Sequence, residues 1–124
     1  MSDNNDSIFG DVIFRYTRAN AIADGVLVDL SHVTTVKEHW KFPFACTDTV
    51  FGLMERAIEE HGNDLAGIMH DISLMAKAEI RNGSRADVIH FKVFIGPTLH
   101  DLKLHIGPGD TSEPVMTLML PHED

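Results

Sequence analysis

The spacing of the hydrophobic residues changes once along the chain, and this change limits the folds that the chain can adopt. Before residue 84, apolar side chains recur every three or four residues, as in helices that bury one face. After residue 85 they alternate with polar side chains, as Ile89, Phe91, Val93 and Ile95 do, which is typical of half-buried strands. Helices followed by strands predict an α+β fold.

Two helices are expected in the middle of the chain, joined as a helical hairpin. Thr47 or Asp48 supplies the N-cap oxygen of the first helix, and Gly62 ends it. Asn63 or Asp64 caps the second helix, which ends near residue 83. The expected apolar stripe of the second helix consists of Leu65, Ile68, Met69, Ile72, Met75, Ala76 and Ile80.

The strands are expected at the C-terminal end. Alternation predicts strands at Val88–Ile95, 101–106 and 114–120, and glycine and proline between them indicate turns, so the three form an antiparallel meander. A shorter strand at 26–30 follows an N-terminal helical stretch and is a candidate for one added edge strand. With 124 residues, the chain has the size of one domain, expected over residues 8–124 after a disordered tail at 1–7.

The net charge and the cysteine content of the chain limit the cellular compartment and the binding partners that we expect. Nineteen acidic residues against ten basic ones leave a net charge of −9, which opposes autonomous binding to DNA or RNA. A single cysteine, Cys46, excludes a disulfide framework within the chain and fits a reducing cytoplasm. The longest run without a charged residue, 114–122, is too short to cross a bilayer, so no membrane association is expected.

Acidic side chains concentrate in the predicted helical hairpin. Residues 48–71 contain six acids against Arg56. These acids are either solvated helix faces or a negative surface that imitates nucleic-acid phosphates and occupies a basic groove on another protein. The candidate partner-binding residues are Asp48, Glu55, Glu59, Glu60, Asp64 and Asp71.

The histidines and the cysteine are the candidates for chemistry. None of the eight histidines has a spacing diagnostic of a metal site, although strand parity places His90, Asp101 and His105 on one polar face as weak metal-ligand candidates. These residues are equally well explained as polar side chains on a solvent-exposed face of the sheet, so no metal or other cofactor is expected. Cys46 precedes a helix N-terminus, whose dipole would favour the thiolate, but no base is fixed beside it and a core thiol is the alternative. No catalytic residue is therefore assigned.

Both ends of the chain carry stretches that resemble a known family. Residues 8–13, 16–29, 106–110 and 114–124 are similar to an uncharacterised family of small bacterial proteins carried on plasmids and phages. The resemblance implies a mobile-element context, in which small acidic proteins often block host defence machinery such as CRISPR effectors and restriction enzymes. It brings no activity and no catalytic residue.

These observations favour a small acidic cytoplasmic protein that acts by binding a protein partner with a basic surface, rather than as an enzyme. The sharpest version is an inhibitor of a host defence complex, of anti-CRISPR or anti-restriction type. One alternative is a small metal- or histidine-dependent enzyme that uses His90, Asp101 and His105. Another is a plasmid or phage accessory factor that works within a larger nucleic-acid assembly.

The net charge generates a first prediction. Purified protein should give no gel shift with duplex DNA, single-stranded DNA or RNA at about 100 mM salt and micromolar protein, because a charge of −9 repels phosphates. A shift at sub-micromolar protein would contradict it.

Overall fold

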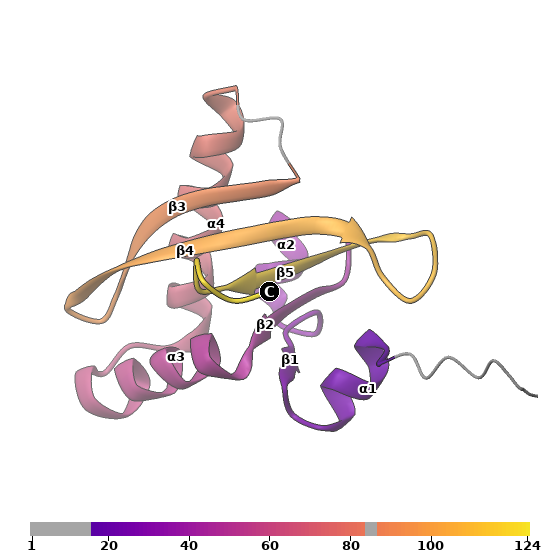
Figure 1. Ribbon diagram of the computed structural model, residues 1–124. Helices are drawn as coiled ribbons and strands as arrows, with labels where there is room; N and C mark the ends of the chain where they lie inside the picture. The colour runs from indigo at the N-terminus through magenta and orange to yellow at the C-terminus, as the bar shows by residue number, and fades with distance from the viewer. Residues whose placement is uncertain (1–15, 84–86) are drawn as a thin grey trace, which may run out of the picture.

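The computed structural model of the protein describes residues 16–83 and 87–124 (Figure 1). The tail expected at 1–7, and the helical stretch before residue 16, lie outside the described residues. Within the described residues, the elements are α1 (Arg18–Ala23), β1 (Leu27–Asp29), α2 (Thr34–His39), β2 (Phe44–Thr47), α3 (Asp48–His61), α4 (Leu65–Arg81), β3 (Val88–Ile95), β4 (Thr98–Pro108) and β5 (Pro114–Met119).

The strands form one mixed sheet in the order β1-β2-β5-β4-β3. β3, β4 and β5 pair antiparallel, as a meander requires, and β1 pairs antiparallel with β2. β2 and β5 are parallel, with Phe44 opposite Met116 and Cys46 opposite Leu118. Parallel neighbours need a long crossover, and here α3, α4, β3 and β4 supply it.

The expected sheet of three strands is therefore incomplete, because the chain forms a five-stranded sheet. The sequence prediction missed β2, whose four residues are all buried and so show no alternation of apolar and polar side chains. The strand expected at 26–30 is present as β1 and lies at an edge, but it pairs with β2 rather than with the meander.

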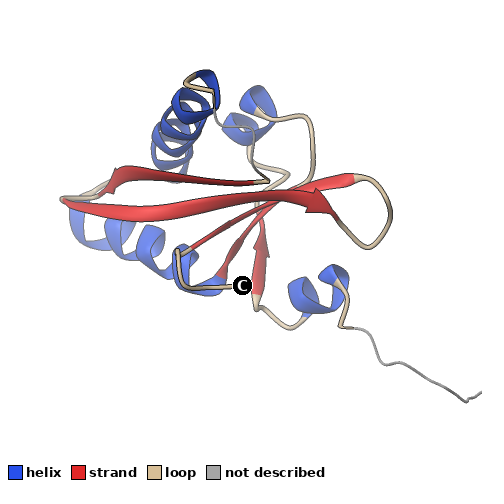
Figure 2. Ribbon diagram, turned by 45° about the horizontal axis from the view of Figure 1, so that its top comes forward, coloured by secondary structure: helices blue, strands red, loops and turns tan. Residues whose placement is uncertain are grey.

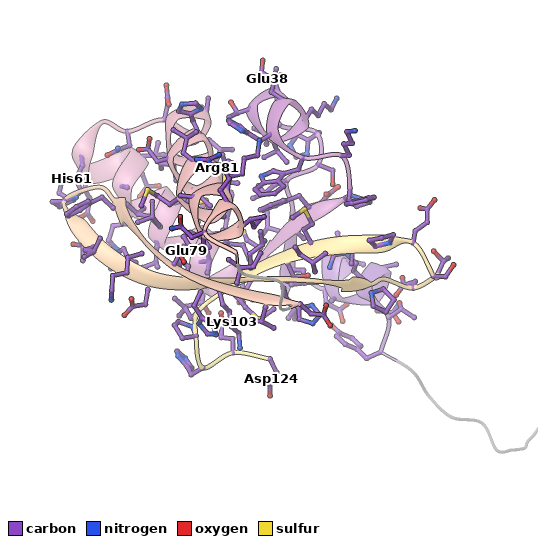
Figure 3. The ribbon with its side chains drawn as sticks, turned by 90° about the horizontal axis from the view of Figure 1, so that it is seen from above. Glu38, His61, Glu79, Arg81, Lys103 and Asp124 are labelled. Carbon is purple, nitrogen blue, oxygen red and sulfur yellow. The ribbon has the colours of Figure 1, made fainter. Side chains whose placement is uncertain are left out.

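The main core lies between one face of the sheet and the helices. α3 and α4 pack on this face, and α2 packs against α4, whereas α1 stands apart from them beside β1 (Figure 2). Figure 3 shows Glu79 and Arg81 of α4 on one side of the sheet and Lys103 of β4 on the other. None of the described helices is long and apolar enough to cross a bilayer. The buried helical residues of this core are Val36, Val50, Met54, Ala57, Ile68, Met69, Ile72 and Ala76.

The ends of α3 and α4 confirm the capping predictions. Thr47 Oγ1 accepts a hydrogen bond from the backbone N–H of Val50 (3.3 Å), and Asp64 Oδ1 accepts one from Gly67 (2.7 Å). Gly62 ends α3 with a φ of +71°, which glycine adopts without strain. α3 and α4 run in different directions in Figure 1, so the predicted hairpin is open rather than closely paired.

The N-terminal helix is fastened to the C-terminal strands. The carboxylate of Asp110 accepts hydrogen bonds from the backbone N–H groups of Arg18 (2.7 Å) and Ala19 (3.0 Å). The guanidinium of Arg18 donates to Thr117 Oγ1 (2.7 Å) and to the carbonyl oxygen of Met116 (2.8 Å). Residues almost one hundred positions apart are thus joined by charge-assisted hydrogen bonds.

Candidate functional site

Four of the six predicted partner-binding acids lie on α3, and all four are exposed. Asp48, Glu55 and Glu59 are separated by seven and four residues, a spacing that places them on one face of the helix. Glu60 follows directly on the neighbouring face. The structure therefore brings the α3 acids together on solvent-facing surface.

The other two acids have different surroundings. Asp64 is exposed, but its carboxylate caps α4 through the backbone N–H of Gly67. Asp71 lies two turns into α4 and lines a cavity together with the apolar side chains of Met75 and Phe94. The structure thus does not gather all six acids into one surface.

The weak metal-ligand candidates share a face of the sheet without forming a site. His90, Asp101 and His105 all project from the face opposite the helices, as strand parity predicts. Lys103 stands opposite His90, and Lys92 forms an ion pair with Asp101. Within residues 16–83 and 87–124, no three His, Cys, Asp or Glu side chains lie close enough together to hold a metal ion.

Cys46 is a core residue of β2. Its side chain is buried, and burial raises the pKa of its thiol to about 12, with smaller contributions from the negative charges of Glu123 and Asp48. The adjacent start of α3 was expected to favour the thiolate, but desolvation outweighs the helix dipole. At neutral pH Cys46 is therefore a protonated thiol, which is a poor nucleophile.

An apolar groove lies between α4 and β3. Four large apolar side chains are unusually exposed there: Phe94 (59%), Leu99 (50%), Met75 (44%) and Leu74 (43%). Together with Asp71 they line a cavity of about 310 Å³. The helical stripe predicted from the sequence placed Met75 in the core, and the structure corrects this. Exposed apolar surface of this kind commonly marks a binding site for a protein.

A polar cluster that the sequence did not predict joins α2 to α4. His39 Nε2 and His70 Nδ1 are 3.1 Å apart, and Lys77 Nζ lies 3.0 Å from His39 Nδ1. Nearby, the indole N–H of Trp40 donates to the hydroxyl of buried Ser73 (3.0 Å). The one signal in the sequence was that His70, Ser73 and Lys77 share a face of α4 by their spacing.

The ammonium group of Lys77 determines where the protons of this cluster lie. An ammonium only donates, so His39 Nδ1 accepts from Lys77, and the neutral His39 ring carries its proton on Nε2 and donates to His70. The pKa of His39 is lowered by burial and then by the charges of Lys77 and His70, while Glu38 opposes the shift. The cluster therefore holds His39 neutral.

This arrangement predicts a defined pH dependence. Folding lowers the pKa of His39 below the ordinary histidine pKa of about 6.5. Neutral His39 therefore stabilises the fold fully at a pH above about 6.5, and this stabilisation is lost as the pH falls through the lowered pKa. The difference in unfolding free energy between the parent and His39→Gln should shrink between about pH 7 and pH 5. Nitrogen NMR at neutral pH should show the proton of His39 on Nε2. A proton on Nδ1, or a difference that does not change with pH, would contradict this assignment.

Comparison with known proteins confirms that the chain resembles an uncharacterised family, whereas the expected bacterial, plasmid or phage context stays a prediction. A family of unknown function, DUF6573, matches residues 4–124. No curated protein and no solved structure matches the chain. Because the match covers almost the whole sequence, the chain belongs to the DUF6573 family.

Proposed function

We propose that the protein acts by binding another protein that carries a basic surface, and that the exposed acids of α3 provide part of the recognition. The observation that carries this proposal is the common helical face of Asp48, Glu55 and Glu59. α3 has four acidic side chains against Arg56, on a chain whose net charge is −9. Such a surface accelerates encounter with a positively charged partner.

The sharpest form of the proposal is inhibition of a host defence complex that handles nucleic acid. Nucleic-acid grooves on such proteins are lined with lysine and arginine, so a row of carboxylates on a rigid helix can take the place of phosphates there. The mobile-element context implied by the resemblance at both ends of the chain supports this form. The ion pair of Asp101 with Lys92 leaves the alternative of a metal-dependent enzyme with less support.

A second candidate function has one observation in its favour. Among the residues that line a cavity of about 450 Å³ near α2 are Lys37, Lys41, Trp40 and Phe42. Lysine and aromatic side chains together suit a phosphate and a stacked base. This favours an accessory factor that contacts nucleic acid inside a larger assembly, where a partner offsets the chain's negative charge.

Charge reversal on α3 tests the main proposal. Changing Glu55, Glu59 and Glu60 to lysine takes the net charge from −9 to about −3, since each change adds two charges. Association with a partner captured from host lysate should slow about tenfold or more at low salt, and the effect should fade near 1 M salt as the Debye length shortens.

The control makes an equal charge change at Asp3, Asp6 and Asp124, at the two ends of the chain. If both triple variants bind alike while their melting temperatures stay near the parent's, the acidity serves general solubility and the proposal is wrong. If only the α3 variant loses binding, α3 is a recognition surface.

A further inference from the structure

β3 presents one side of its backbone at an edge of the sheet. Among the described strands it has one neighbour, β4. The backbone N–H of Ile106 donates to the carbonyl oxygen of Asp87 (2.8 Å), so these two residues form a hydrogen-bonded pair. The next pair along the two strands is Val88 and His105. Because antiparallel hydrogen bonding alternates along a strand, the odd-numbered residues of β3 bond to β4. The N–H and C=O groups of His90, Lys92 and Phe94 therefore point to the open edge.

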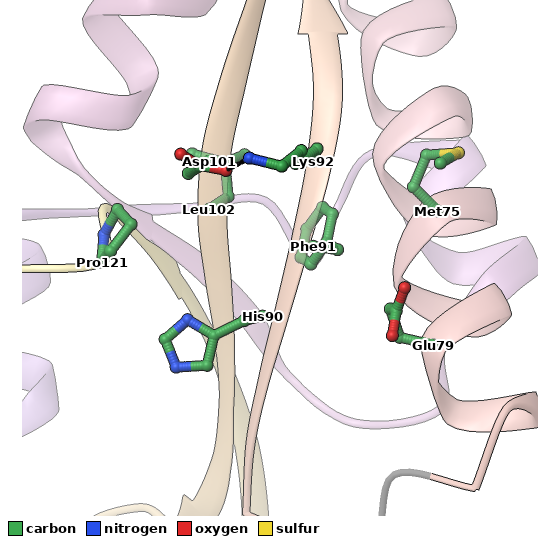
Figure 4. A pocket seen from close by; sticks show the side chains of 8 residues that line it. All are labelled: Met75, Glu79, His90, Phe91, Lys92, Asp101, Leu102 and Pro121. Carbon is green, nitrogen blue, oxygen red and sulfur yellow. Dashed lines mark hydrogen bonds and ion pairs between the residues drawn. The ribbon is translucent and has the colours of Figure 1, made fainter.

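A groove runs along this edge, with α4 as its other wall. Two cavities, of about 450 and 310 Å³, share Met75 and Lys92, and their lining residues on β3 run from His90 to Phe94. The larger one also reaches Leu102 and Pro121, beyond β3. Figure 4 shows Met75 and Glu79 of α4 beside β3, on the opposite side of the strand from His90. Two adjoining cavities thus lie along the edge of β3.

The two walls of the groove match in length. Asp71, Met75 and Glu79 are four residues apart along α4, so they lie on one face over about 12 Å. His90 to Phe94 spans about 13 Å of extended strand. A groove of this length holds four or five residues of an extended chain.

We propose that this groove binds an extended segment of a partner protein, which adds to the sheet as a sixth strand beside β3. The inference rests on the proposed function, because it specifies how a basic protein partner is held. Backbone groups of the segment would pair with the open edge, and its side chains would point alternately towards the wall formed by α4 and towards the face of the sheet that carries Phe94. Exposed apolar side chains on two elements give the segment its anchoring positions.

Charge identifies the kind of segment. The charged side chains around the groove are those of Asp71, Glu79, Asp101 and Lys92, and the last two form an ion pair. Two carboxylates remain, both on the wall formed by α4. A segment in which apolar and basic residues alternate therefore fits best. A second copy of this chain fits less well, because each copy carries a charge of −9 and would add its own Lys92 to the same edge.

A peptide titration on the full chain tests strand addition. The probe is an acetylated peptide in which valine and lysine alternate, added to ¹⁵N-labelled protein. We expect saturable shifts of the amide signals of His90, Lys92 and Phe94, because their N–H groups gain acceptors. The same peptide with alternate amide nitrogens methylated should bind about tenfold more weakly, since it cannot complete the hydrogen-bond ladder. A peptide in which valine and glutamate alternate should also bind about tenfold more weakly, because its negative charges are repelled by the carboxylates of α4.

A pair of variants tests the edge from the protein's side. His90→Pro removes an N–H that points away from β4, so the existing ladder stays intact. His90→Ala removes the same side chain and keeps the N–H. His90→Pro should weaken the valine–lysine peptide about tenfold while His90→Ala binds like the parent. The methylated peptide gives the same information on unaltered protein if the proline variant does not fold.

Several results would overturn this proposal. Three concern the peptide: no binding at all, equal binding of the methylated and unmethylated peptides, or amide shifts confined to α3. Another is dimerisation of the free chain that His90→Pro abolishes, because it would show that a second copy occupies the groove. Shifts confined to α3 would leave the proposed function standing. Capture of the partner from host lysate separates the two proposals as well. If charge reversal on α3 abolishes capture and His90→Pro does not, the acidic surface of α3 binds the partner and the groove does not.

Discussion

The parallel pair of β2 and β5 is the interaction on which the rest of the fold depends. All four residues of β2 are buried, and Phe44 and Cys46 lie opposite Met116 and Leu118 in the middle of the sheet. This pairing closes a loop of about seventy residues, so the entropy of closure must be offset by burial on both faces of the strand. Once it forms, Arg18 can reach β5, and the first helix is held by the last strand.

The position of β5 also determines where the sheet is open. With β2 on one side of β5 and β4 on the other, β3 is displaced to the far edge, where α4 passes beside it. Edge strands invite pairing with other chains, and proteins commonly blunt them with charged side chains such as lysine. Here Lys92 is held by Asp101, and the neighbouring Phe94 remains exposed. The edge is thus only partly protected, which is consistent with use as a binding surface.

Local signals in the sequence predicted much of the fold. The caps at Thr47 and Asp64, and β3 with both of its ends, follow from hydrogen-bonding chemistry within a few residues or from strict alternation. β2 was missed because a strand buried on both faces has no polar partner residues to give it a period. The groove was not predicted because helical spacing shows only that Met75 belongs to the apolar face of α4. It does not show that this part of the face lies beyond the edge of the sheet and is exposed. The contact of His39 with His70 joins elements thirty-one residues apart, which no spacing rule predicts.

The central claim is that β3 lies at an open edge, with alternate backbone groups facing outward. Amide hydrogen exchange of the free protein, measured residue by residue along β3, tests it most directly. The N–H groups of Ile89, Phe91, Val93 and Ile95 should exchange slowly because they bond to β4, while those of His90, Lys92 and Phe94 should exchange much faster. Uniform protection along β3 would mean that another segment covers this edge, and it would contradict both the open edge and the groove beside it.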